Sequence, residues 1–137
     1  MTKITPVNVE FPDDVHAAVA LSYDLEMCAG YAPDGINHGK IIPEIQSYTL
    51  KLCEVAEKYN TKMHFFYVCN GLEDENIDYL IEIHRRGHII DSHTYSHQGI
   101  AVVPPDKLDY ELKKANQLLN ERLCIASTVL RGPCGYK

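Results

Sequence analysis

The sequence has no long apolar run and no long run of basic residues. No stretch approaches the ~20 consecutive apolar residues of a membrane-spanning helix, and residues 1–6 lack the apolar core behind a basic flank that marks a secretory signal. No run of Lys or Arg is longer than the pair Arg85-Arg86, and 13 Lys and Arg stand against 19 Asp and Glu, for a net charge of −6. We therefore expect a cytoplasmic protein with no membrane span and no nucleic-acid-binding surface.

Cysteine, glycine and proline are also scarce or scattered. The five cysteines are odd in number and include no C-x-x-C pair, which argues against a disulfide scaffold or a zinc ribbon. The 8 Gly and 7 Pro exclude a fibrous chain, while 45% hydrophobic and 23% charged residues are close to the averages of globular proteins. With 137 residues, the chain has length for a single domain.

Four short apolar runs alternate with three stretches of helical periodicity. The runs cover residues 17–23, 63–69, 88–91 and 127–130. The helices are expected from Pro43 to about Asn60, over 76–86, and from Pro104 to about Leu119. The first helix carries a stripe that we expect to face the core, made of Ile45, Tyr48, Leu52, Val55 and Tyr59. This alternation predicts an α/β fold with about four parallel strands and three helices.

Polar residues follow each apolar run. In parallel sheets the carboxyl ends of the strands lie at one edge, where functional residues gather. The residues at that edge are Asp24 and Glu26 after the first run, Asn70 after the second, His93 and His97 after the third, and Arg131 after the fourth.

His93 and His97 are four residues apart, so both imidazoles can reach one divalent metal if the segment turns tightly. The alternative is a pair of hydrogen-bonded structural histidines. His84 and His88 have the same spacing but lie at the opposite end of the third run, and there we favour a structural role.

Asp24 and Glu26 are two residues apart, so in an extended segment their carboxylates point the same way. One could bind metal while the other takes a proton from water, although a solvated acidic loop is the alternative. Two histidines, one carboxylate and an open position are typical of a hydrolytic Zn²⁺ centre, which lowers the pKa of bound water to ~7. Arg131 could hold a carboxylate or cap a strand.

Three segments resemble motifs of one family. They are LSYDLE at 21–26, GHIIDSHTYSH at 87–97 and RGPCGY at 131–136. They resemble the polysaccharide deacetylases, the NodB homology domain of the family 4 carbohydrate esterases. The resemblance covers most of residues 15–137 and leaves residues 1–14 as an N-terminal extension.

The resemblance implies a partial irregular (β/α) barrel and metal-dependent hydrolysis of N- or O-acetyl groups on carbohydrate, with Zn²⁺ the favoured metal. It implies that Asp24 is the general base and that Arg131 orients it. The implied metal ligands are Glu26, His93 and His97. The residues expected to contact the substrate or the oxyanion are Asn70, Tyr136 and the main-chain N–H near Cys134.

The sequence departs from the family pattern in two ways. Leu25 stands where the family most often has a second aspartate, so Glu26 is the substitute ligand. The sequence ends after the third motif, so the histidine that protonates the leaving amine is absent, and loss of a general acid typically costs about 10²- to 10⁴-fold in rate. We therefore expect a homo-oligomer or a fragment of a longer chain.

Two alternatives remain open. One is a metal-free amidohydrolase of the same fold that acts on a small cyclic amide or ureide. The other is an inactive, truncated binding domain. Bound metal separates the first alternative from a deacetylase, and hydrolysis that a chelator abolishes separates an enzyme from a binding domain.

Overall fold

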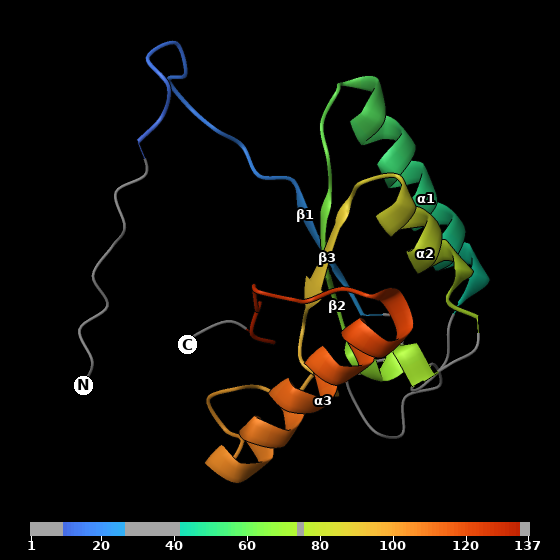
Figure 1. Ribbon diagram of the computed structural model, residues 1–137, viewed down its shortest axis with the longest axis vertical. Coiled ribbons are helices and arrows are strands. Elements are labelled where there is room, and N and C mark those ends of the chain that lie inside the picture. The colour runs from blue at the N-terminus through green and yellow to red at the C-terminus, as the bar shows by residue number, and fades with distance from the viewer. Residues whose placement is uncertain (1–9, 27–41, 74–75, 135–137) are drawn as a thin grey trace.

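A computed structural model describes residues 10–26, 42–73 and 76–134 of the chain (Figure 1). Three strands, β1 (Ser22–Leu25), β2 (His64–Tyr67) and β3 (Ile89–Ser92), form a parallel sheet in the order β1-β2-β3. The helices are α1 (Pro43–Lys58), α2 (Asp78–Arg85) and α3 (Pro105–Leu123), with a 3₁₀ turn η1 at Cys69–Glu73. The predicted α/β architecture is confirmed. Among the described helices, none combines the length and apolarity needed to cross a bilayer.

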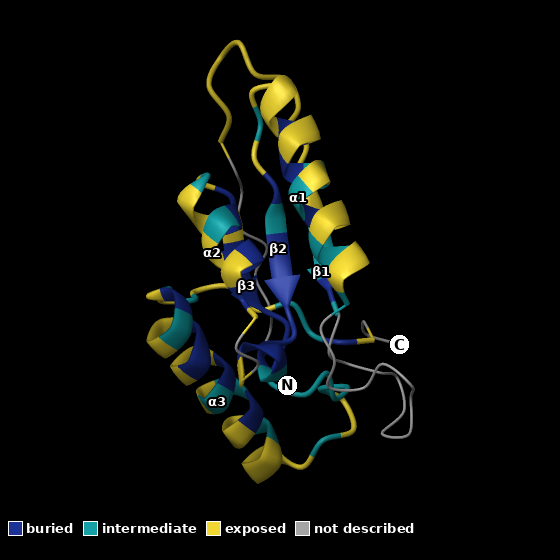
Figure 2. Cartoon of the chain, turned by 90° about the vertical axis from the view of Figure 1, so that its right-hand side faces the viewer, coloured by how far each residue is buried: buried dark blue, intermediate teal, exposed yellow. Residues whose placement is uncertain are grey.

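The core lies between the sheet and two of the helices. Helices α1 and α2 run side by side over one face of the sheet, and their inward surfaces are buried (Figures 1 and 2). That face carries Leu25, Phe65, Tyr67 and Ile90, all buried in one hydrophobic cluster. Because side chains alternate along a strand, the opposite face carries Asp24, His64, Phe66 and Asp91, and none of the described helices covers it.

The first predicted strand is displaced. We expected residues 17–23, whereas β1 spans Ser22–Leu25 and Val19 is 83% exposed. The ladder sets these limits, because Ser22 pairs with His64 and Leu25 with Tyr67. The apolar residues before Ser22 extend past the start of β2, so they have no neighbouring strand against which to be buried.

The fourth predicted strand, 127–130, is reduced to one bridge between Ser92 and Leu130. A side chain explains the loss. The Asp91 carboxylate accepts hydrogen bonds from the Ser127 hydroxyl at 2.6 Å and from the Thr128 N–H at 3.2 Å. The Thr128 N–H thus bonds to a side chain instead of to the main chain of β3, and the ladder does not extend beyond the bridge. The sheet therefore has three strands and not four.

Helix α1 begins at the predicted Pro43, but only part of the predicted stripe faces the core. Its buried residues are Thr49, Cys53 and Ala56, while Tyr59 of the predicted stripe is 80% exposed. Ile45 of the stripe packs against the core as predicted, whereas Tyr48, Val55 and Tyr59 are exposed, because the buried positions lie one residue further along the helix. Thr49 can be buried because its hydroxyl donates to the Ile45 carbonyl oxygen at 2.7 Å.

His88 is a buried structural residue at the amino end of β3. Its Nδ1 accepts from the Met63 N–H at 3.0 Å, and its Nε2 lies 3.1 Å from Glu57 Oε1. Burial lowers the pKa of His88, and the Glu57 hydrogen bond opposes that shift. The hydrogen bond from Arg86 is the main cause that lowers the pKa of Glu57 to about 2.

Candidate metal and hydrolytic site

The carboxyl ends of the strands bring five of the predicted site residues together. Asp24 lies in β1 and Glu26 follows it, His93 follows β3, and His97 ends the turn after β3. Arg131 directly follows the bridge that joins Leu130 to Ser92, and its N–H donates to the Ser92 carbonyl oxygen at 3.1 Å. Residues more than 100 positions apart therefore meet at one edge of the sheet.

Glu26, His93 and His97 converge on one point. Each offers a ligand atom, and these atoms lie within 4.8 Å of one another. Glu26 Oε1 is 3.3 Å from His93 Nε2 and 3.1 Å from His97 Nε2. The side chains of His93 and His97 are only 2% and 7% exposed, so the surrounding protein shields both imidazoles from solvent.

The hydrogen bonding of His93 suits a metal ligand. Its Nδ1 lies 2.7 Å from the main-chain carbonyl oxygen of Arg131, and a carbonyl oxygen only accepts, so Nδ1 carries the proton. In the neutral ring Nε2 then presents a lone pair toward the Glu26 carboxylate. Two electron-rich atoms at 3.3 Å need a cation or a proton between them. The donor set of two imidazoles and one carboxylate fits a divalent metal such as Zn²⁺.

The turn that carries the histidines has an unusual backbone. Thr94 and His97 have positive φ angles of 66° and 58°, which residues with a Cβ rarely adopt. Three hydrogen bonds hold the turn there: the Thr94 hydroxyl accepts from the His97 N–H at 3.1 Å, the Thr94 carbonyl from Cys69 N–H at 2.9 Å, and the Tyr95 carbonyl from Asn70 N–H at 2.8 Å.

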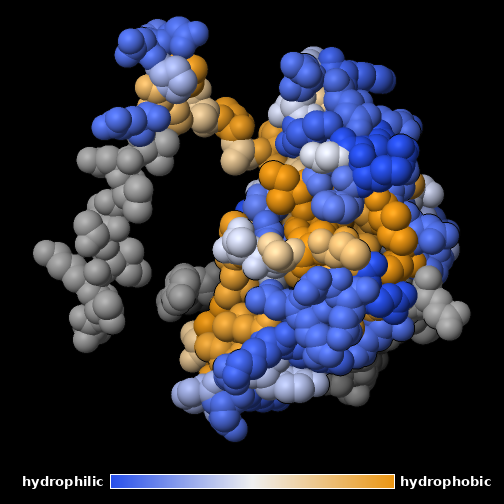
Figure 3. All heavy atoms as spheres, viewed as in Figure 1, coloured by the Kyte–Doolittle hydropathy of each residue, from blue (hydrophilic) through white to orange (hydrophobic). Residues whose placement is uncertain are grey.

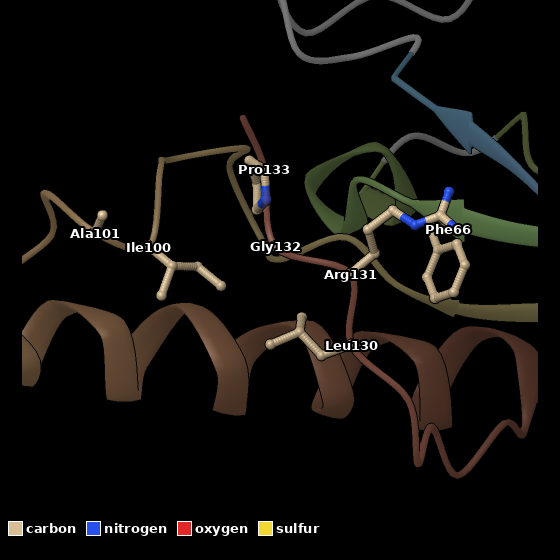
Figure 4. Close-up of a pocket in the computed structure, with 7 residues that line it drawn as sticks. All are labelled: Phe66, Ile100, Ala101, Leu130, Arg131, Gly132 and Pro133. Atoms are coloured by element: carbon tan, nitrogen blue, oxygen red, sulfur yellow. The ribbon is translucent and has the colours of Figure 1, made fainter. Parts of the chain in front are cut away.

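Arg131 holds Asp24 beside the histidines. Its Nη1 donates to Asp24 Oδ1 and its Nη2 donates to Ser22 Oγ at 2.8 Å. The guanidinium carbon also lies 4.0 Å from the centre of the Phe66 ring, a cation–π contact visible in Figure 4. Asp24 Oδ2 is 4.0 Å from His93 Nε2, so the free oxygen of this carboxylate faces the candidate metal position.

A cavity of about 490 Å³ opens over these groups. It is lined by Asp24, Glu26, His93, His97, Arg131, Gly132 and Cys134. A second hollow of about 300 Å³ adjoins it through Arg131 and Gly132, and its walls include Phe66, Ile100 and Pro133 (Figure 4). The site thus has a polar part beside an apolar one.

The three residues predicted to contact the substrate or oxyanion differ in where the structure places them. Cys134 lines the cavity, with an exposed side chain and a φ of 65°. Asn70 does not line the cavity, and its Oδ1 is buried without a hydrogen-bond partner among the described residues. Tyr136 lies outside the described residues.

Sequence reasoning missed three residues around the site. Phe66 supports Arg131, Asp91 fastens the segment before Arg131, and Glu111 of α3 binds the histidine turn. Asp91 lies inside the second motif, so its position was a signal, whereas nothing in the sequence marks Glu111.

Comparison with known proteins decides the family. The family model described as polysaccharide deacetylase matches residues 18–137. The chain belongs to the polysaccharide deacetylase family. Over 94 residues it is 30% identical to a peptidoglycan-N-acetylglucosamine deacetylase of Bacillus cereus, a match that covers 68% of this chain and 33% of the relative. The chain thus spans about a third of that curated relative's length.

Solved structures of the family share the fold. A structure from Mycobacterium smegmatis assigned to the polysaccharide deacetylases is 21% identical with a TM-score of 0.76, and the match covers 96% of this chain and 48% of that one. A family 4 acetyl xylan esterase from Clostridium thermocellum, solved with a cobalt ion, is 22% identical with a TM-score of 0.60, covering 83% of this chain and 47% of that one. The family fold is a barrel, of which this chain matches about half.

Proposed function

We propose that the chain carries the metal and base part of a hydrolase that removes acetyl groups from an acetylated carbohydrate. The observation that carries this proposal is the convergence of two imidazoles and one carboxylate within 4.8 Å, with an arginine-held aspartate beside them. Family membership supports the same reaction class.

Each side chain has a role that its contacts support. Glu26, His93 and His97 would hold a divalent ion, for which Zn²⁺ is our choice because imidazole nitrogen and carboxylate oxygen are its ordinary ligands. Such an ion would polarise the acetyl carbonyl and make water a stronger acid at neutral pH. Asp24 takes the proton from the attacking water on its free oxygen, and the Arg131 guanidinium orients that carboxylate.

The cavity suits an N-acetyl sugar. The polar part holds the reacting groups, and the main-chain N–H near Cys134 would donate to the oxygen of the tetrahedral intermediate. The adjoining hollow walled by Phe66 and Ile100 offers apolar surface for a sugar ring. The Bacillus cereus relative is named for N-acetylglucosamine in peptidoglycan, so an N-acetylglucosamine polymer is the substrate class we propose.

The test is release of amine from acetylated chito-oligomers by the 137-residue chain, before and after chelator and with Zn²⁺ restored. Asp24→Asn should abolish turnover and keep metal binding. Asp78→Asn, at the exposed first turn of α2, is the matched control and should keep both. Turnover that survives the chelator would contradict metal dependence, and hydrolysis of a cyclic ureide in its place would favour the small-amide alternative. A chromogenic aryl acetate has a leaving group that needs no protonation, so metal binding without hydrolysis of such an ester would indicate the binding-domain alternative.

A further inference from the structure

A buried carboxylate of helix α3 binds the turn between His93 and His97, which we call the histidine turn. Glu111 is 3% exposed, and its two oxygens both bind Ser96. Oε2 accepts from the Ser96 N–H at 2.7 Å and Oε1 accepts from the Ser96 hydroxyl at 2.6 Å. The sequence separation is only 15 residues, but the two groups belong to different elements, a loop and a helix.

Tyr110, the residue before Glu111 on α3, contacts the same turn at Tyr95. The Tyr110 ring lies 5.9 Å from the Tyr95 ring in an edge-on arrangement. The Tyr95 hydroxyl also donates to the Glu73 carboxylate at 3.1 Å. Tyr95 and Ser96 are therefore both fixed to surrounding elements.

Tyr95 and Ser96 lie between the two residues with strained backbone angles. Thr94 and His97 hold left-handed φ angles, and Ser96 is the residue directly before His97. Without the Glu111 bonds, the backbone at Ser96 would lose its fixed N–H partner while the strain at both flanking positions remained. His97 would then sample orientations in which its Nε2 leaves Glu26.

We propose that Glu111 is a positioning residue for His97, and that its bidentate hold on Ser96 sets the affinity of the candidate site for a divalent metal. The inference rests on the proposed function in so far as a metal binds Glu26, His93 and His97. Groups that orient metal ligands typically contribute about 10- to 100-fold to metal affinity.

The experiment uses the 137-residue chain and Co²⁺, which reports both affinity and coordination by its visible spectrum. Glu111→Ala should weaken Co²⁺ binding by about 10- to 100-fold. Glu111→Gln should weaken it less, because the amide oxygen still accepts from the Ser96 N–H and the amide nitrogen can donate to the hydroxyl. Leu123→Ala is the matched control: it removes a buried side chain 12 residues further along α3 and should lower stability without changing Co²⁺ affinity.

A second readout needs no metal. In the metal-free protein, Glu111→Ala should accelerate amide hydrogen exchange at Ser96 and His97, and Leu123→Ala should not do so selectively. Equal Co²⁺ affinity in wild type and Glu111→Ala overturns the inference, as does an equal weakening by Leu123→Ala. A wild-type chain that binds no Co²⁺ overturns both the proposed metal site and the affinity claim. Accelerated exchange would then still show that Glu111 holds the turn.

Discussion

Arg131 contacts His93 through its main chain and Asp24 through its side chain. Its carbonyl oxygen lies 2.7 Å from His93 Nδ1, and its guanidinium donates to the Asp24 carboxylate. One residue therefore sets the tautomer of a candidate ligand and the orientation of the candidate base. Because the two contacts use different parts of the residue, substitution can separate them.

Replacing the Arg131 side chain should slow hydrolysis and leave metal binding intact. In Arg131→Met the main-chain carbonyl still accepts from His93, while Asp24 loses its cationic partner. We expect the turnover rate to fall by about 10²- to 10⁴-fold, the range for an impaired general base. Turnover and Zn²⁺ affinity measured on the same preparation check this. Arg85→Met removes an exposed arginine of α2 as a control, and a parallel loss of Zn²⁺ in Arg131→Met would contradict the separation.

Removing one imidazole should remove the stabilisation that metal provides. A ligand that binds only the folded chain at 100 times its dissociation constant stabilises it by about 2.7 kcal/mol. Zn²⁺ should therefore raise the urea midpoint of wild type and of His84→Ala, whose histidine lies on the exposed surface of α2. His97→Ala should show no such shift. A Zn²⁺ response that His97→Ala retains would place the metal elsewhere.

Stability should fall as the pH drops below neutrality, first because of His88. Its pKa is lower in the folded chain than its ordinary 6.5, so the unfolded chain binds more protons as the pH falls below that value. Glu57 adds a second loss as the pH falls from about 4.5 toward about 2, where its folded pKa lies. Urea unfolding at pH 7.5 and 5.5 measures the first loss.

His88→Asn should reduce that pH dependence, since the asparagine carbonyl can still accept from the Met63 N–H but does not titrate in this range. His84→Asn is the matched control at an exposed position and should leave the slope unchanged. An unaltered slope in His88→Asn would show that another group causes the acid sensitivity.

Exposed apolar side chains on β3 and on the segment before Arg131 should make the isolated chain self-associate. Figure 3 shows apolar side chains at the surface of the molecule, and Ile89, Val129 and Leu130 are among the exposed large apolar residues. Ile89→Lys should shift sedimentation toward the monomer. Ile81→Lys places the same change on the outer side of α2 at a nearly identical exposure, 47% against 49%, and should not. A wild-type chain that sediments as a compact monomer would contradict this expectation.

The sequence pattern predicted where the helices begin and end better than which residues they bury and which strands pair. Pro43 and Gly87, which has a φ of 79°, mark the start of α1 and the end of α2. The face that α1 buries was not predictable from apolar spacing, because Thr49 satisfies its hydroxyl within the helix and takes an inward position. The fourth strand did not form as predicted, because the Asp91 side chain binds the Thr128 N–H, a group that a ladder would use.

The sequence predicted the residues of the candidate site, but it did not predict the residues that hold them in position. A parallel sheet places the carboxyl ends of its strands at one edge, so Glu26 and His93 could be expected to meet from topology alone. The supports come from tertiary contacts without a local signature: Phe66 under Arg131, and Glu111 beneath Ser96. Whether these side chains perform the proposed chemistry stays a prediction.

The single bridge between Ser92 and Leu130 affects the order in which the molecule comes apart. The segment that ends at Arg131 has one main-chain bridge to β3 and is otherwise held by hydrogen bonds that include those of the Asp91 carboxylate and the His93 ring, while β1, β2 and β3 share continuous ladders. Weakly attached segments open at lower free energy than the core. Mild denaturant should therefore release the arginine from Asp24, its partner 107 positions earlier, while the sheet is still intact. The proposed hydrolysis would then be lost at a lower denaturant concentration than the fold.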